Sequence, residues 1–220
     1  FITEKRACMI HQAVRLIADE LRAFLTDELN TTATVLSLAN VADLEQDNDF
    51  QMRERILMTV VNIEEESALK NIKSPMLPRA DGSVAYEEPP VFINLYLLFT
   101  STYDQSGDFY ERALQRLALV IQFFQSKRVF SIHNSPGSSV AGNAAIHPED
   151  RNFLRISLEL YTMTFEQINH LWGSLGGHQV PFAMYKARLV RVRDRRTTGT
   201  GPVIEEVGTG EKVVPAASSN

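Results

Sequence analysis

The chain has 220 residues, of which 44% are hydrophobic, and this suits one domain or one domain with an appendage. Its formal net charge of -5 argues against nucleic acid and anionic lipid as main partners, because both attract clustered Lys and Arg. No apolar run approaches the roughly 20 residues that cross a bilayer, and no secretion signal opens the chain. We therefore expect synthesis in the cytosol and no membrane in the core function.

The first third of the chain predicts one helix and two strands. Apolar residues recur at helical spacing from Glu4 to about Leu29, which indicates an amphipathic helix. A short strand is expected over Thr34 to Val41. The segment Ile56 to Ile63 is apolar at odd and even positions alike, as in a strand that is covered on both faces. Prolines and the Asp81-Gly82 pair then predict a long loop between Asn71 and Pro90.

A strand and a helix are predicted next. Val91 to Phe99 alternates, with the odd-numbered residues on one face and the even-numbered residues on the other. Asp108, with Glu111 three residues later, resembles a capping box and predicts a helix that ends near Ser126. Four residues form its expected buried stripe: Leu114, Leu117, Ile121 and Phe124.

A second long loop follows a short strand at Val129 to Ile132. The segment His133 to Asp150 is rich in Ser, Gly, Asn and Pro, and loops of this length usually serve function or partner contact. A further strand is expected over Leu154 to Tyr161.

The last elements carry clear end signals. Thr164 with Gln167 predicts a capped helix start, and Gly176-Gly177 predicts its left-handed stop. A final strand is expected over Phe182 to Val192.

This order predicts an α/β fold, a mixed β-sheet with packed helices, extended loops and a C-terminal arm. We expect residues 1–193 to form one domain. Residues 194–220, rich in Thr, Gly, Ser and Pro, are expected to be a flexible or partner-ordered extension. In that extension, Val203 to Val207 with Lys212 to Val214 are candidates for a hairpin or for a strand added to a neighbour.

No pattern in the sequence completes a known catalytic, cofactor or metal site. The five histidines lack the spacing of a zinc protease, and the single Cys8 can form no internal disulfide. Ser174 ends a predicted helix instead of following a strand, so it is a poor nucleophile candidate. The run Glu64 to Glu66 is most simply a solvated charged segment. We therefore expect no catalytic residue, no cofactor and no metal.

Arginines near the last strand are the strongest electrostatic feature. Because arginine pairs well with carboxylates at protein interfaces, we expect these residues to make subunit contacts and not to bind nucleic acid. They are Arg188, Arg191, Arg193, Arg195 and Arg196. Alternation along an extended strand would align Arg191, Arg193 and Arg195 in one row.

Several motifs follow one another along the second half of the chain: PPVFINLYLLF (89–99), Tyr103, Tyr110, LVIQFF (119–124), LEL (158–160), INHLWGSLGG (168–177), Pro181 and YKAR (185–188). In order and spacing, these motifs resemble the N-terminal domain of cap proteins from extracellular contractile injection systems. The resemblance spans about Pro89 to Val192. The polar segment His133 to Asp150 and the tail after Arg193 depart from it.

The resemblance implies a tail-terminator-like subunit of a sixfold ring at the distal end of the tube and sheath. Such a subunit would stop tube and sheath growth and anchor the last sheath ring. Its partners would be further copies of itself and the tube and sheath proteins of the particle. It would assemble in the bacterial cytoplasm and leave the cell as part of the particle. Within the motifs, we expect structural roles for Asn94, Tyr96, Asn169, Trp172, Gly176 and Gly177, with Trp172 as a packing anchor. Two alternatives stay open: another ring component such as a connector or sheath-initiating protein, or a small hydrolase with its site in the 133–150 loop.

Overall fold

The computed structural model describes residues 9–46, 52–69, 76–78, 83–103, 108–143, 146, 148–177, 179–192 and 197–201. These residues belong to two units of the chain. The first unit comprises residues 1–71 and 91–192, and the second comprises residues 72–90 and 193–220.

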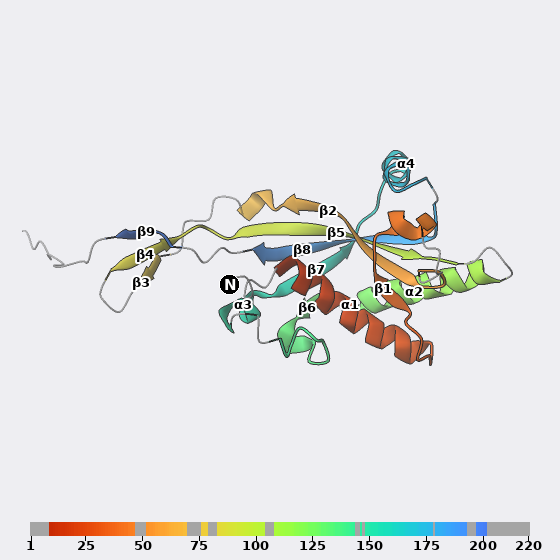
Figure 1. The fold of residues 1–220 in the computed structure, drawn as a ribbon, viewed down its shortest axis with the longest axis horizontal. Helices are drawn as coiled ribbons and strands as arrows, with labels where there is room; N and C mark the ends of the chain where they lie inside the picture. The colour runs from red at the N-terminus through yellow and green to blue at the C-terminus, as the bar shows by residue number, and fades with distance from the viewer. Residues whose placement is uncertain are drawn as a thin grey trace, which may run out of the picture. The chain divides into compact units, whose positions relative to one another are not determined.

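A six-stranded mixed sheet organises the first unit (Figure 1). Its strand order is β1-β2-β5-β8-β7-β6. The pair β1–β2 is parallel, and the other neighbours are antiparallel. The strands are β1 (Leu36–Leu38), β2 (Ile56–Glu65), β5 (Val91–Ser101), β6 (Val129–Ser131), β7 (Arg155–Leu160) and β8 (Phe182–Val192).

Helices cover both faces of this sheet, as Figure 1 shows. The helices α1 (Met9–Glu28) and α2 (Phe109–Ser126) pack on one face, where they contribute to the first core cluster. On the opposite face, α4 (Phe165–Ser174) and the 3-10 helix η1 (Val41–Gln46) contribute to a second, smaller cluster. The shorter elements are η2 (Ser67–Leu69), η3 (Ile132–Asn134) and α3 (Pro148–Phe153). The predicted α/β class is confirmed.

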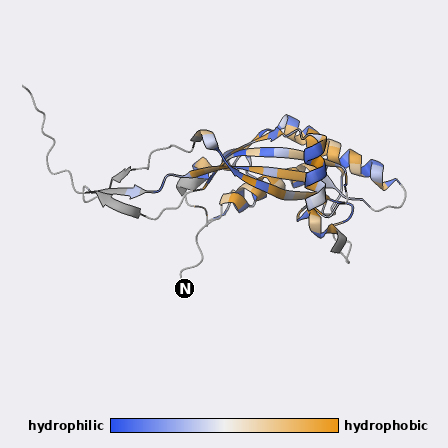
Figure 2. Ribbon diagram, turned by 90° about the horizontal axis from the view of Figure 1, so that it is seen from above, coloured by the Kyte–Doolittle hydropathy of each residue, from blue (hydrophilic) through white to orange (hydrophobic). Residues whose placement is uncertain are grey.

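Strand β5 supplies side chains to both clusters because successive residues of a strand point to opposite faces. Leu95, Leu97 and Phe99 belong to the first cluster, while Leu98 belongs to the second. The alternation predicted for this strand is therefore confirmed. Figure 2 shows that hydrophobic residues are frequent along the strands of the sheet.

Strand β2 is covered along only half its length. Ile56 to Thr59 are buried, but Val60 to Glu65 are half-buried or exposed. The predicted coverage on both faces is thus correct for the first half alone. The neighbouring strand β1 has only three residues and pairs only with Ile56 to Met58, so the sheet narrows beyond that point.

Helix α2 differs from its prediction in its start and in its buried face. Asp108 precedes the helix, but its side chain makes no capping hydrogen bond. Leu114 and Ile121, which were expected in the core, are 43% and 41% exposed. Leu117 and Phe124 are buried as predicted, and the other buried residues are Ala113, Val120 and Phe123. The docking of the helix on β5 and β8 turns a neighbouring stripe inward, and a helix that is apolar over a wide arc permits either rotation.

Helix α4 has the predicted ends. The Thr164 side chain accepts a hydrogen bond from the Gln167 backbone N–H, and the Gln167 side chain accepts one from the Thr164 N–H, which completes a capping box. Gly176 and Gly177 have φ values of 101° and 85°, and the Gly177 N–H donates to the Trp172 carbonyl at 2.7 Å. Glycine suits this left-handed turn because it has no Cβ.

The second unit contains strands where the sequence predicted a loop. β3 (Met76–Pro78), β4 (Val84–Glu87) and β9 (Thr197–Gly201) form a sheet in the order β3-β4-β9. Pro78 is the last residue of β3, and Pro89 and Pro90 follow β4, so these prolines bound strands without interrupting them. Pairing of β4 with β9 joins residues more than 100 positions apart, and no local pattern reveals such a contact.

The segment after β6 is largely irregular, as predicted, but it begins in η3 and leads into the unpredicted α3. A capping box between Ser131 and Asn134 caps the start of η3. Three sequence predictions fall outside the described residues: the helix start from Glu4 to Cys8, and the candidate hairpin segments 203–207 and 212–214.

Candidate interaction surfaces

A polar network covers one face of the sheet across β2, β5 and β8. The Tyr96 hydroxyl donates to Glu64 Oε2 at 2.7 Å, and Lys186 Nζ lies 3.6 Å from the same oxygen. The hydrogen bond from Tyr96, followed by the charge of Lys186, lowers the pKa of the Glu64 carboxyl. The same hydrogen bond raises the pKa of Tyr96. Glu64, beyond the covered part of β2, therefore makes specific contacts although it is exposed.

Asn94 lies in the same network and is almost fully buried, at 2% exposure. Its Nδ2 donates to Glu66 Oε2 at 3.0 Å, and this bond is the largest cause of a lowered pKa at Glu66. At the β7 side of this network, Arg188 Nη1 on β8 lies 3.4 Å from Glu159 Oε1 on β7. Asn94 and Tyr96 thus hold the end of β2 to β5 through side chains as well as through the backbone.

The predicted arginine row is only partly described. Arg188 pairs with Glu159, and the Arg191 guanidinium lies 4.0 Å from the centre of the Phe153 ring. A shift in register between β5 and β8 near these residues interrupts simple alternation along β8. Arg193, Arg195 and Arg196 lie outside the described residues, so the role of these arginines in subunit contacts stays a prediction.

Trp172 lies in the second core cluster with Leu57, Leu98 and Met184, and only 4% of it is exposed. Its ring meets the Phe182 ring edge to face, with 5.5 Å between centroids. Asn169, one turn earlier, is exposed. Trp172 therefore packs the end of α4 against the sheet.

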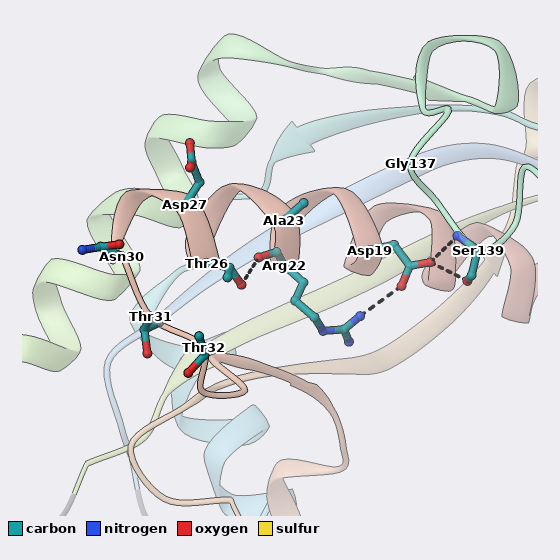
Figure 3. A pocket seen from close by; sticks show the side chains of 10 residues that line it. All are labelled: Asp19, Arg22, Ala23, Thr26, Asp27, Asn30, Thr31, Thr32, Gly137 and Ser139. Carbon is teal, nitrogen blue, oxygen red and sulfur yellow. Dashed lines mark hydrogen bonds and ion pairs between the residues drawn. The ribbon is translucent and has the colours of Figure 1, made fainter.

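A set of polar contacts, here called the polar clasp, joins α1 to the 135–142 segment, and no pattern in the sequence predicted it. Asp19 Oδ2 accepts a hydrogen bond from the Ser139 N–H at 3.0 Å and others from the hydroxyls of Ser138 and Ser139 (Figure 3). Burial acts to raise the pKa of Asp19, but these hydrogen bonds and the charge of Arg15 together lower it. No local signal in the sequence links Asp19 to a residue 120 positions away.

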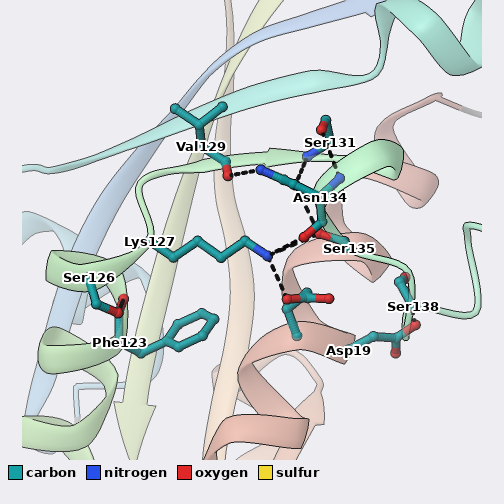
Figure 4. Close-up of polar contacts among 10 residues, drawn as sticks. Asp19, Phe123, Ser126, Lys127, Val129, Ser131, Asn134, Ser135 and Ser138 are labelled. Carbon is teal, nitrogen blue, oxygen red and sulfur yellow. Dashed lines mark hydrogen bonds and ion pairs between the residues drawn. The ribbon is translucent and has the colours of Figure 1, made fainter.

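Lys127, which follows α2, extends this clasp (Figure 4). Its Nζ lies 2.7 Å from Glu20 Oε2 and 2.8 Å from the Asn134 carbonyl oxygen. Asn134 in turn donates through Nδ2 to the Val129 carbonyl at 2.9 Å. One lysine thus ties α1, the end of α2 and the long polar segment together.

The clasp borders an open groove of about 690 Å³, lined by α1 and by Gly137 and Ser139 (Figure 3). Its polar groups are mostly hydroxyls and the paired Asp19 and Arg22, with neither a histidine nor a cysteine. Across the described residues, no three His, Cys, Asp or Glu side chains gather where a metal ion would bind. Nor is any helix in that part of the chain both long and apolar enough to span a bilayer.

The hydrolase alternative finds little support in the 133–150 segment. Its described histidine, His133, contacts the Asn152 amide oxygen at 3.3 Å, and an amide oxygen is not a nucleophile that a base can activate. His178 and His147 lie outside the described residues.

Large apolar side chains are exposed near the end of the sheet where α2 and α4 lie. Leu114 and Ile121 project from α2, Leu160 from the end of β7, and Phe165 from the start of α4. A groove of about 220 Å³ lies between α2 and β7, with Ile121 and Leu160 among its lining residues. Exposed apolar surface beside a groove is typical of protein–protein contacts.

Comparisons with known proteins agree with the motif resemblance. The family model described as "Pvc16 N-terminal domain" matches residues 14–206. The cryo-EM structure of the sheath/tube terminator of an extracellular contractile injection system, PVC, in its extended state aligns with a TM-score of 0.58 and 14% identity, over 99% of this chain and 67% of that chain. The tube-terminating cap of the anti-feeding prophage aligns with a TM-score of 0.54 and 16% identity, over 88% of this chain and 58% of that chain. No curated protein sequence matches the chain.

Proposed function

Because the chain belongs to the Pvc16 N-terminal domain family, we propose that it is a structural cap subunit of a phage-tail-like contractile injection system. In this role it forms a ring at the distal end of the tube and sheath, stops their growth and anchors the last sheath ring. Its partners are further copies of itself and the tube and sheath proteins of the same particle. The function is assembly and not turnover of a substrate.

The family match from residue 14 to residue 206 is the observation that carries this proposal. It begins in α1 and extends past β9, so it includes elements of both units. The two solved structures with this fold are titled as a sheath/tube terminator and a tube-terminating cap, which supports the same role here.

A ring requires each subunit to present two different surfaces, because head-to-tail contacts close a cyclic oligomer. The chain offers two exposed apolar surfaces on opposite faces of the sheet, one around Ile121 on α2 and one around Phe165 on α4. We propose a hexamer, assembled in the bacterial cytoplasm and carried out of the cell in the particle. The first unit, residues 1–71 and 91–192, supplies the cap domain, and the second unit, residues 72–90 and 193–220, supplies partner contacts.

The test is particle length and the position of the chain in the particle. Particles made without this chain should have tubes and sheaths of widely varying length in negative-stain electron micrographs, and supplying the wild-type chain should restore a narrow distribution. A gold-labelled tag on the chain should mark the end opposite the baseplate. An unchanged length distribution without the chain would contradict the proposal, and label at the baseplate end would indicate a sheath-initiating component instead.

A further inference from the structure

Phe165 is the most exposed of the large hydrophobic side chains described, at 88%. Helical spacing places it one turn before Ile168 and two turns before Trp172, which pack in the second core cluster. Phe165 therefore continues the buried stripe of α4 beyond the surface that the stripe covers. An exposed aromatic ring has few rotatable bonds to order, and on a helix start held by a capping box it is a low-entropy anchor for a partner.

The groove between α2 and β7 is a candidate receptor for such a ring. Ile121 and Leu160 are exposed at the groove, and Phe124, Leu158 and Tyr185 are buried residues of the first core cluster that also line it. At about 220 Å³, the groove has room for one aromatic side chain. It lies with α2 on the opposite face of the sheet from α4, so one copy cannot fill its own groove with Phe165 without rearranging.

The charged residues beside the Phe165 side chain and beside the α2–β7 groove are opposite in sign. Glu166, next to Phe165, has an 86% exposed side chain whose nearest partner is His170 at 3.9 Å. Arg128 lines the groove, is exposed, and donates to the Gln125 side chain at 3.0 Å. The acidic residue at the groove, Glu159, already pairs with Arg188.

We propose that Phe165 of one copy inserts into the α2–β7 groove of a second copy, with Glu166 beside the second copy's Arg128. This proposal rests on the proposed ring function, and it identifies the two surfaces through which neighbouring subunits bind. The Phe165 side chain and the α2–β7 groove are different surfaces on opposite faces of the sheet. The contact between two copies is therefore head-to-tail, and it can repeat from subunit to subunit until the oligomer closes.

A charge exchange tests the pairing. Glu166→Arg and Arg128→Glu should each weaken self-association roughly tenfold or more, measured by light scattering or by incorporation into particles, and the double variant should recover most of the loss. Phe165→Ala should weaken association at least as much. Leu38→Ala, which removes an exposed apolar side chain from β1 at the other edge of the sheet, should leave association unchanged. Normal association of Phe165→Ala and Glu166→Arg would overturn the proposal.

Disulfide trapping provides a second readout that does not depend on affinity. In a Cys8→Ser background that keeps Phe165, Asn169→Cys, at an exposed position one turn after Phe165, with Ile121→Cys should give a ladder of linked chains after oxidation of assembled particles, whereas either cysteine alone should give no ladder. If particles are capped normally but no ladder forms, the contact is wrong and the cap function stands. If a ladder forms in the purified protein but the chain is absent from particle ends, the contact stands and the cap function is wrong.

Discussion

The Asp19 carboxylate in α1 accepts a hydrogen bond from the backbone N–H of Ser139, at 3.0 Å, across 120 residues of sequence. Hydroxyl groups of Ser138 and Ser139 donate to the same oxygen. This contact gives the polar 135–142 segment a defined place against the first helix of the chain.

Asp19→Asn should lower the free energy of unfolding by about 1–3 kcal/mol at neutral pH, because charge-assisted hydrogen bonds are lost at a largely buried position. The folded state lowers the Asp19 pKa, so its stabilisation is complete above the unfolded value of about 3.9 and disappears as pH falls through the folded value. Urea unfolding between pH 2 and pH 7 measures both effects. The exposed Asp27→Asn is the control, and an equal loss in both variants would contradict the clasp.

Trp172→Ala should destabilise the monomer by about 3–5 kcal/mol, since it empties a large part of the second core cluster. Trp172→Phe should cost less, because it keeps an aromatic ring and removes an indole N–H that lacks a hydrogen-bond partner in the described structure. Thermal or chemical unfolding of the purified chain measures these values. A Trp172→Ala monomer of normal stability that fails only to assemble would show that the residue serves an interface instead.

Glycines in and after α4 should respond to alanine with opposite signs. Gly176→Ala should destabilise by about 1 kcal/mol or more, because φ of 101° is strained for a residue with a Cβ. Gly173→Ala should be neutral or stabilise by up to about 1 kcal/mol, because Gly173 lies within the helix and a Cβ there meets no atom within 4 Å. Unfolding midpoints of the two variants give the comparison, and the same sign for both would refute the assigned turn.

Tyr96→Phe should raise the pKa of Glu64 toward its ordinary value, because the hydroxyl hydrogen bond is the main cause that lowers it. In the wild type, the Glu64 carboxyl stays ionised to lower pH, so its contact with Tyr96 is kept above the ordinary glutamate pKa and is lost in acid. NMR titration of side-chain carboxyl carbons measures the shift. Glu159, on the far side of the network, is the internal control, and an unmoved Glu64 would contradict the assigned contact.

Local signals in the sequence were sufficient for the elements whose cause is local. The capping box of Thr164 and Gln167, the glycine turn at 176–177 and the alternation of β5 depend on residues within a few positions of one another. The motifs along β5, α4 and β8 likewise indicated the family, which the match over residues 14–206 confirms.

Tertiary structure decided the features that depend on distant partners. Which stripe of α2 is buried depends on its docking against β5 and β8, so Leu114 and Ile121 are exposed although their spacing suits a core. Likewise, strands β3 and β4 gain β9 as a partner, and Asp19 gains Ser139, only once the chain has folded. Residues that are far apart in the sequence and meet only in the fold produce no local periodic pattern. The sequence therefore predicted a loop where β3 and β4 lie, and it gave no partner for Asp19.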